Sequence, residues 1–199
     1  MSEPSPARIL SEEVLSSAWG RLTRYTIAYT RRDGVTETQI REVYDHGNGS
    51  AVLPLDRERG TVLLVRQFRL AACLQGGSGL LVEACAGLND GLPPEQAVVK
   101  EAEEELGCAL RDLRHITDVF MSAGSLSERI SLFMARYTPE DRFSEGGGAE
   151  GEGEDIEVLE LPLGDALAMI ARGEIVDAKT IILLQMAERE QLQPGTHSR

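Results

Sequence analysis

Two strand-like runs of hydrophobic and polar residues mark the N-terminal part of the chain. They occupy residues 22–29 and 36–43, and Arg32-Asp33-Gly34 lies between them. An Asp-Gly pair between two such runs favours a tight turn, because both residues tolerate the backbone angles that the turn requires. The pattern therefore predicts a β-hairpin, and the polar residues 1–10 are expected to be loosely ordered.

Short β-rich runs follow the hairpin and alternate with turn residues. They predict strands at residues 51–55, 61–66, 80–84, 113–121, 130–137 and 157–161. Two later segments, residues 163–172 and 179–190, predict helices. Mixed strands around helices are typical of an α/β or α+β fold.

A central helix is predicted from the proline pair at 93–94 to Gly107. Proline is tolerated in the first turn of a helix, and glycine favours its end. The residues of its apolar face are Val98, Val99, Ala102 and Leu106. The sequence therefore predicts an amphipathic helix among the strands.

The opposite face of this helix is acidic. Four of the five residues from 101 to 105 are glutamates, and Glu101, Glu104 and Glu105 point to one side. Each pair of like charges costs about 0.2–0.5 kcal/mol. Carboxylate oxygens at this density favour a hard cation such as Mg²⁺, and the alternative is a solvated acidic surface.

Composition limits the partners of the chain. Its 199 residues, 42% of them hydrophobic, suffice for one globular domain with an N-terminal appendage. The net charge of −13 argues against nucleic acid, which requires a basic surface. The sequence shows neither an export signal nor an apolar run of about 18 residues, so we expect a cytoplasmic protein with no membrane partner. Three cysteines without metal-ligand spacing predict buried thiols.

Residues 87–108 resemble the Nudix box, a signature of glycine and glutamate residues. Its second half runs from Lys100 to Gly107, with lysine in place of the usual arginine. The spacing from Gly87 to Lys100 is one residue shorter than the general pattern, and the first glutamate is absent. The shorter spacing and the lysine at position 100 resemble one branch of the family, the GDP-mannose pyrophosphatases.

Segments outside the box also resemble that branch, namely residues 41–49, 65–69, 83–88, 154–162 and 173–180. The resemblance implies a Nudix-type α-β-α sandwich with a mixed sheet and an N-terminal β-hairpin extension. It also implies three parts. These are a dimer-forming extension over residues 1–45, a hydrolase domain over 46–191 and a disordered tail over 192–199.

The resemblance further implies a site for Mg²⁺, with Mn²⁺ as a substitute. The implied metal ligands are the Ala86 carbonyl and the carboxylates of Glu101, Glu105 and Glu154. Glu104, Glu105 and Glu154 are the implied catalytic residues, and Glu154 either binds metal or orients the attacking water. Glu154 lies in the glycine-rich segment 144–155, which is expected to be an active-site lid. The alternative is an unimportant insertion.

Substrate contacts are carried over from the family one residue at a time. They are Trp19, Arg41, Glu42, Arg69, Gly87, Leu88, Glu128 and Lys179. Trp19 stands where the family presents an aromatic ring to the base, and Trp19 and Arg41 would come from the second subunit of a homodimer.

The predicted function is Mg²⁺-dependent hydrolysis of a nucleoside-diphosphate sugar, GDP-mannose first, giving GMP and mannose 1-phosphate. ADP-ribose is the alternative substrate, although residues 121–125 lack the proline of the ADP-ribose pyrophosphatase signature. A catalytically silent nucleotide-sugar sensor is the alternative of another class.

Overall fold

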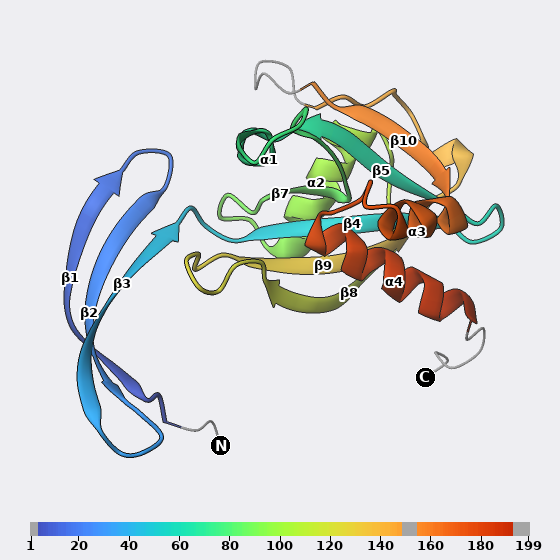
Figure 1. Ribbon diagram of the computed structural model, residues 1–199. Helices are drawn as coiled ribbons and strands as arrows, with labels where there is room; N and C mark the ends of the chain where they lie inside the picture. The colour runs from blue at the N-terminus through green and yellow to red at the C-terminus, as the bar shows by residue number, and fades with distance from the viewer. Residues whose placement is uncertain (1–3, 149–154, 193–199) are drawn as a thin grey trace. The chain divides into compact units, whose positions relative to one another are not determined.

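The computed structural model describes residues 4–148 and 155–192, which form two compact units (Figure 1). The first unit contains the chain up to Gly47 together with Phe120–Arg129. The second unit contains Asn48–Val119 and the chain from Ile130 onward.

The first unit is built on a three-stranded antiparallel sheet of β1 (Ala7–Ser17), β2 (Arg21–Thr30) and β3 (Thr36–Asp45). β2 and β3 confirm the predicted hairpin, and Gly34 adopts the positive φ of +83° that its turn requires. The expectation of a loose N-terminus is wrong for residues 7–10, because β1 pairs with β2 along its length.

The second unit contains a seven-stranded mixed sheet in the order β10-β5-β4-β9-β8, with β6 paired to β5 and β7 paired to β4. Its strands are β4 (Gly49–Asp56), β5 (Thr61–Phe68), β6 (Leu80–Glu83), β7 (Cys85–Leu88), β8 (Arg111–Phe120), β9 (Arg129–Arg136) and β10 (Glu157–Pro162). Its helices are α1 (Leu70–Leu74), α2 (Pro94–Leu106), the short 3₁₀ turn η1 (Pro139–Asp141), α3 (Leu163–Ala171) and α4 (Ala178–Leu192). β4 and β9 run parallel, whereas the partners of β5 run antiparallel to it.

β4 lies in the middle of this unit, and all eight of its residues are buried. Successive side chains of a strand point to opposite faces, so burial along the whole strand requires cover on both faces. Figure 1 shows α2 behind the sheet and α3 and α4 in front of it. Val52 belongs to the core on the α2 side, whereas Leu183 and Leu184 of α4 are buried on the other side. The predicted α-β-α sandwich is confirmed.

Two features of this unit differ from the sequence prediction. The single strand expected at residues 80–84 is two strands, because β6 pairs with β5 and β7 pairs with β4. The short helix α1 was not predicted.

All three cysteines carry free thiols as expected, but Cys73 is only half-buried. None of the helices in the described part of the chain combines the length and apolar character needed to cross a membrane.

Candidate active site

The candidate site is framed by β7 and α2, which are joined by a short loop. Ala86 and Gly87 of β7 pair with Ala51 and Ser50 of β4, so the sheet fixes this backbone. α2 ends at Gly107, whose φ of +59° is the left-handed conformation that closes many helices. Both ends of α2 therefore lie where the proline and glycine signals predicted.

Glu105 turns from the last turn of α2 towards β7. The residue is only 3% exposed, and its Oε2 accepts a hydrogen bond from the backbone N–H of Ala86 at 3.2 Å. Burial, followed by the charge and hydrogen bond of Glu105, raises the pKa of the neighbouring Cys85 thiol well above its usual value. The Glu105 carboxylate thus lies beside the strand that carries Ala86, the position that the resemblance implies for a metal ligand.

Glu101 lies one turn earlier on α2 and reaches the same strand. A Cβ placed on Gly87 would lie 2.2 Å from both Cδ and Oε1 of Glu101. The carboxylate therefore occupies the space that only a glycine leaves free. The structure thus brings Ala86, Gly87, Glu101 and Glu105 together, and their roles as metal and substrate ligands stay predictions.

Replacement of Gly87 by alanine should displace the Glu101 carboxylate and leave the fold intact, because a flexible side-chain end can move. We expect Mn²⁺ affinity, measured by calorimetric titration, to fall by about 10-fold or more. Gly164→Ala is the matched control, since no atom lies within 4 Å of a Cβ at that position. Unchanged Mn²⁺ affinity in Gly87→Ala would show that the Glu101 carboxylate is not needed where the structure places it.

Glu104 is placed differently from the other two carboxylates. Its Oε2 accepts a hydrogen bond from Nζ of Lys100 at 2.8 Å, and about one third of its side chain is exposed. Within residues 4–148 and 155–192, no three His, Cys, Asp or Glu side chains gather closely enough to hold a metal ion. Glu154, the third predicted carboxylate ligand, lies outside the described residues. The donor set described is two carboxylates and a carbonyl, oxygen ligands that suit Mg²⁺.

The start of the glycine-rich segment is bound to the C-terminal end of α2. Gly147 and Gly148 donate backbone hydrogen bonds to the carbonyls of Glu105 and Glu104, at 3.0 and 3.2 Å. Gly146 has a φ of +71°, and a Cβ there would lie 2.2 Å from the Glu105 carbonyl oxygen. The segment therefore satisfies carbonyls that the end of a helix leaves without partners. This contact ties its first residues to the carboxylate-bearing turn.

Arg69 and Lys179 meet on Glu83, a carboxylate that sequence reasoning did not single out. Arg69 Nε and Lys179 Nζ each lie 2.7 Å from a Glu83 oxygen. Burial lowers the pKa of Lys179, but Glu83 and Asp177 outweigh this effect and raise the pKa above its usual value. Lys179 therefore remains charged, and Glu83 holds two cations directly before β7.

Asp177 and Thr180 connect this ion-pair network to the backbone. Asp177 caps α4 by accepting the Thr180 backbone N–H at 3.0 Å, and it also bonds Lys179 at 2.9 Å. Thr180 Oγ1 in turn accepts the backbone N–H of Ala84 at 2.7 Å. The first turn of α4 is thereby fixed to the chain immediately before Cys85. Asp-x-x-Thr ahead of an apolar run is a capping signal that could have identified this junction.

In the first unit the structure joins Trp19 to Glu128 through His46. The rings of Trp19 and His46 stack with centroids 4.9 Å apart and an angle of 21° between their planes. His46 Nε2 lies 3.8 Å from Glu128 Oε1, and its buried Nδ1 has no hydrogen-bond partner among the described residues. Trp19 itself is 73% exposed. The arrangement presents an aromatic surface suited to stacking with a planar ring.

The remaining predicted substrate residues make local contacts. Arg41 donates to the Ile40 carbonyl at 2.8 Å and to Gln39 Oε1 at 2.6 Å. Glu42 accepts two hydrogen bonds from Arg24 across β2 and β3. Leu88 is half-buried at the end of β7, opposite Gly49. Among the described residues, these hydrogen bonds of Arg41 and Glu42 do not reach Trp19, His46 or Glu128.

Comparison with known families identifies the family of the chain. A model of the NUDIX domain matches residues 45–184. The chain belongs to the Nudix family. A second model, described as the N-terminal domain of the GDP-mannose pyrophosphatase NudK, matches residues 7–44. The family expected from residues 87–108 is confirmed, and the chain is an enzyme of the Nudix hydrolase class.

Curated relatives extend over almost the whole chain. The GDP-mannose pyrophosphatase of Pectobacterium atrosepticum is 46% identical over 184 residues, covering 92% of this chain and 94% of the relative. That of Klebsiella pneumoniae is 44% identical over 188 residues, covering 94% of each chain. A solved structure described as an ADP compounds hydrolase aligns with a TM-score of 0.72 at 16% identity, covering 96% of this chain and 97% of the other. At that identity the solved structure supports the fold alone.

Proposed function

We propose that this Nudix enzyme hydrolyses the diphosphate bond of GDP-mannose, giving GMP and mannose 1-phosphate, with Mg²⁺ as cofactor. The observation that carries the proposal is the similarity, 46% over 92% of the chain, to a relative named GDP-mannose pyrophosphatase. The carboxylates of Glu101 and Glu105 beside β7 support it, because diphosphate hydrolysis depends mainly on positioning and charge neutralisation.

Several residues of the second unit have proposed tasks at this site. Glu101, Glu105 and the Ala86 carbonyl would hold the cation. When bound, a divalent cation supplies positive charge where negative charge accumulates on the diphosphate. Glu83 orients Arg69 by accepting from Nε, so that the outer nitrogens of the guanidinium can donate to a phosphate oxygen.

Glu104, Glu154 and Lys179 complete the proposal. Glu104 is proposed as a residue of the outer metal environment, since Lys100 holds its side chain on the helix surface. Glu154 is proposed on the family resemblance alone, as a ligand or as the group that orients the attacking water. Lys179 is proposed to keep Glu83 in place as well as to reach substrate.

The proposed substrate is tested by turnover across a panel of GDP-mannose, ADP-ribose and other nucleotide sugars, with Mg²⁺ and with chelator. We expect GDP-mannose to have the highest kcat/KM and chelator to abolish turnover. A preference for ADP-ribose would change the proposed substrate but not the proposed reaction. Binding of nucleotide sugars without turnover of any panel member would favour the sensor alternative.

We further propose a homodimer in which the first unit of one subunit supplies Trp19 and Arg41 to the active site of its partner. The three-stranded sheet exposes large apolar side chains, including Ile9 at 61%, Val14 at 54% and Ile40 at 59%. A small sheet is marginally stable unless it buries an apolar face, and a second subunit would provide cover.

Subunit mixing tests the shared site. Trp19→Ala and Glu105→Gln homodimers should each be impaired. Each heterodimer should regain one site that has both native groups. Because about half of the dimers in an equal mixture are heterodimers, about a quarter of all sites should be active. A mixture of Arg69→Gln and Glu105→Gln is the control, because both residues belong to the second unit. If subunits exchange and the first mixture regains no activity, the shared-site proposal is wrong.

A further inference from the structure

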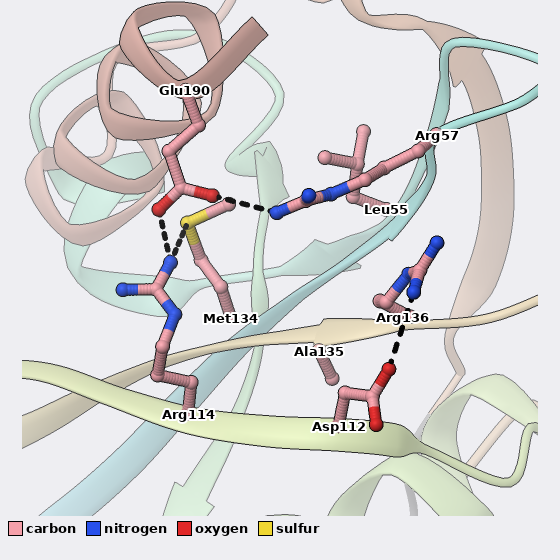
Figure 2. A pocket seen from close by; sticks show the side chains of 8 residues that line it. All are labelled: Leu55, Arg57, Asp112, Arg114, Met134, Ala135, Arg136 and Glu190. Atoms are coloured by element: carbon pink, nitrogen blue, oxygen red, sulfur yellow. Dashed lines mark hydrogen bonds and ion pairs between the residues drawn. The ribbon is translucent and has the colours of Figure 1, made fainter. Parts of the chain in front are cut away.

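A second site of concentrated charge lies in the second unit, away from the carboxylates of α2. It is a hollow of about 260 Å³, lined in part by the side chains of Arg57, Arg114, Arg136, Asp112, Glu190 and Met134 (Figure 2). We call it the arginine hollow. The arginines follow or belong to three different strands, β4, β8 and β9, and Glu190 belongs to α4.

The side chains of the arginine hollow are arranged around Glu190. Figure 2 shows Arg57 and Arg114 pointing to this one carboxylate from two sides. Arg57 Nη2 lies 3.1 Å from Glu190 Oε2, and Arg114 forms an ion pair with Oε1. Arg136 makes a longer contact of 3.4 Å with Asp112. Two guanidinium groups thus already hold one anionic group through charge-assisted contacts, and a phosphate offers acceptor oxygens of the same kind.

The charge of the arginine hollow contrasts with that of the chain. Three guanidinium groups face two carboxylates here, although the whole protein has 20 basic and 33 acidic residues. The side chains of the three arginines are 53%, 44% and 52% exposed, so an incoming anion can reach them. Three positive and two negative side chains give the lining a net charge of +1, which attracts an anion.

We propose that the arginine hollow binds a small phosphomonoester dianion, which takes the place of the Glu190 carboxylate between Arg57 and Arg114. The volume favours a small ligand, because pockets for larger organic molecules span about 300–1,000 Å³. Glu190 lies in the last turn of α4, where a side chain can swing to solvent without moving the helix core. Phosphate esters favour arginine over lysine where two parallel hydrogen bonds are formed.

α4 links the arginine hollow to the candidate active site. The first turn of this helix contains Lys179 and Thr180, which bond Glu83 and the backbone of Ala84. Glu190 lies 11 residues further along, about 16 Å at the rise of an α-helix. A ligand that releases Glu190 removes two of the contacts that hold the C-terminal end of this helix on the sheet. The binding proposal stands independently of the proposed function.

Calorimetric titration without divalent cation tests the proposal, with inorganic phosphate and mannose 1-phosphate as separate probes. Tighter binding of mannose 1-phosphate would identify a sugar phosphate as the ligand, and equal affinities would identify phosphate alone. Glu190→Gln should bind either probe several-fold more tightly, because the competing carboxylate loses its charge. Arg57→Gln combined with Arg114→Gln should weaken binding by about 10-fold or more.

Two further variants keep the test decisive. Arg172→Gln is the matched control, since Arg172 is an exposed arginine paired with Glu174 outside the arginine hollow. Arg136→Gln replaces the double variant if that protein does not fold, and it should weaken binding too. Absence of saturable binding in both wild type and Glu190→Gln would overturn the proposal. Binding that is unaffected by Glu190→Gln and by the arginine variants would overturn it as well.

Discussion

Glu105→Gln is expected to lower kcat by about 100-fold or more while the protein stays folded. The substitution keeps the size of the side chain and its hydrogen bond to the Ala86 N–H, but it removes the charge beside β7. Loss of one ligand charge should weaken Mg²⁺ binding and the stabilisation of the transition state together. Turnover of GDP-mannose over a range of Mg²⁺ concentrations, with thermal unfolding as the fold check, measures both effects.

Glu103→Gln provides the matched control for that experiment. Glu103 is on the same helix and carries the same charge, but it is exposed and lies on another face. We expect it to retain near wild-type turnover. A Glu105→Gln enzyme with near-normal kcat at saturating Mg²⁺ would contradict the assignment of Glu105 as a ligand.

Lys179→Met is expected to lower the free energy of unfolding by about 3–5 kcal/mol, because it leaves the buried Glu83 and the partly buried Asp177 without their shared cation. Lys179 is only 11% exposed at its side chain and lies 2.7 Å from Glu83 and 2.9 Å from Asp177. Urea denaturation measures the change. Glu83 retains Arg69, so the loss should fall towards the lower end of the range.

Lys100→Met is the control, since the chain contains one other lysine and it is exposed on α2. Its ion pair with Glu104 joins two partly exposed side chains four residues apart, and such pairs contribute about 0.3–0.5 kcal/mol. Equal losses in the two variants would show that burial of Lys179 in the network adds no stability.

Local signals explain which parts of the fold could be predicted. The boundaries of α2 follow from Pro94 and Gly107, and the β2–β3 turn follows from Asp33-Gly34. These residues determine backbone geometry within a few positions of themselves. The break between β6 and β7 has no such signal, because it arises from pairing with two different strands, β5 and β4. β1 was not predicted for the same reason, because it forms a strand through its pairing with β2.

The residues of the candidate site also differ in whether the sequence could reveal them. Glu101 and Glu105 could be found because helical spacing and the family resemblance both indicate them. Glu83 could not be found, because the two cations that contact it, Arg69 and Lys179, lie 14 and 96 residues away in the sequence. The stacking of His46 on Trp19 could not be predicted either, because it depends on how the first unit folds. Contacts of this range require the tertiary structure.

The products of GDP-mannose hydrolysis test the central claim most directly. The ³¹P NMR spectrum of GDP-mannose with enzyme and Mg²⁺ should lose its two diphosphate signals and gain two equal phosphomonoester signals, those of GMP and mannose 1-phosphate. The signals should not change on the same timescale with Glu105→Gln protein. An unaltered spectrum with the wild-type enzyme, or the appearance of GDP through cleavage of the sugar bond, would contradict diphosphate hydrolysis at this site.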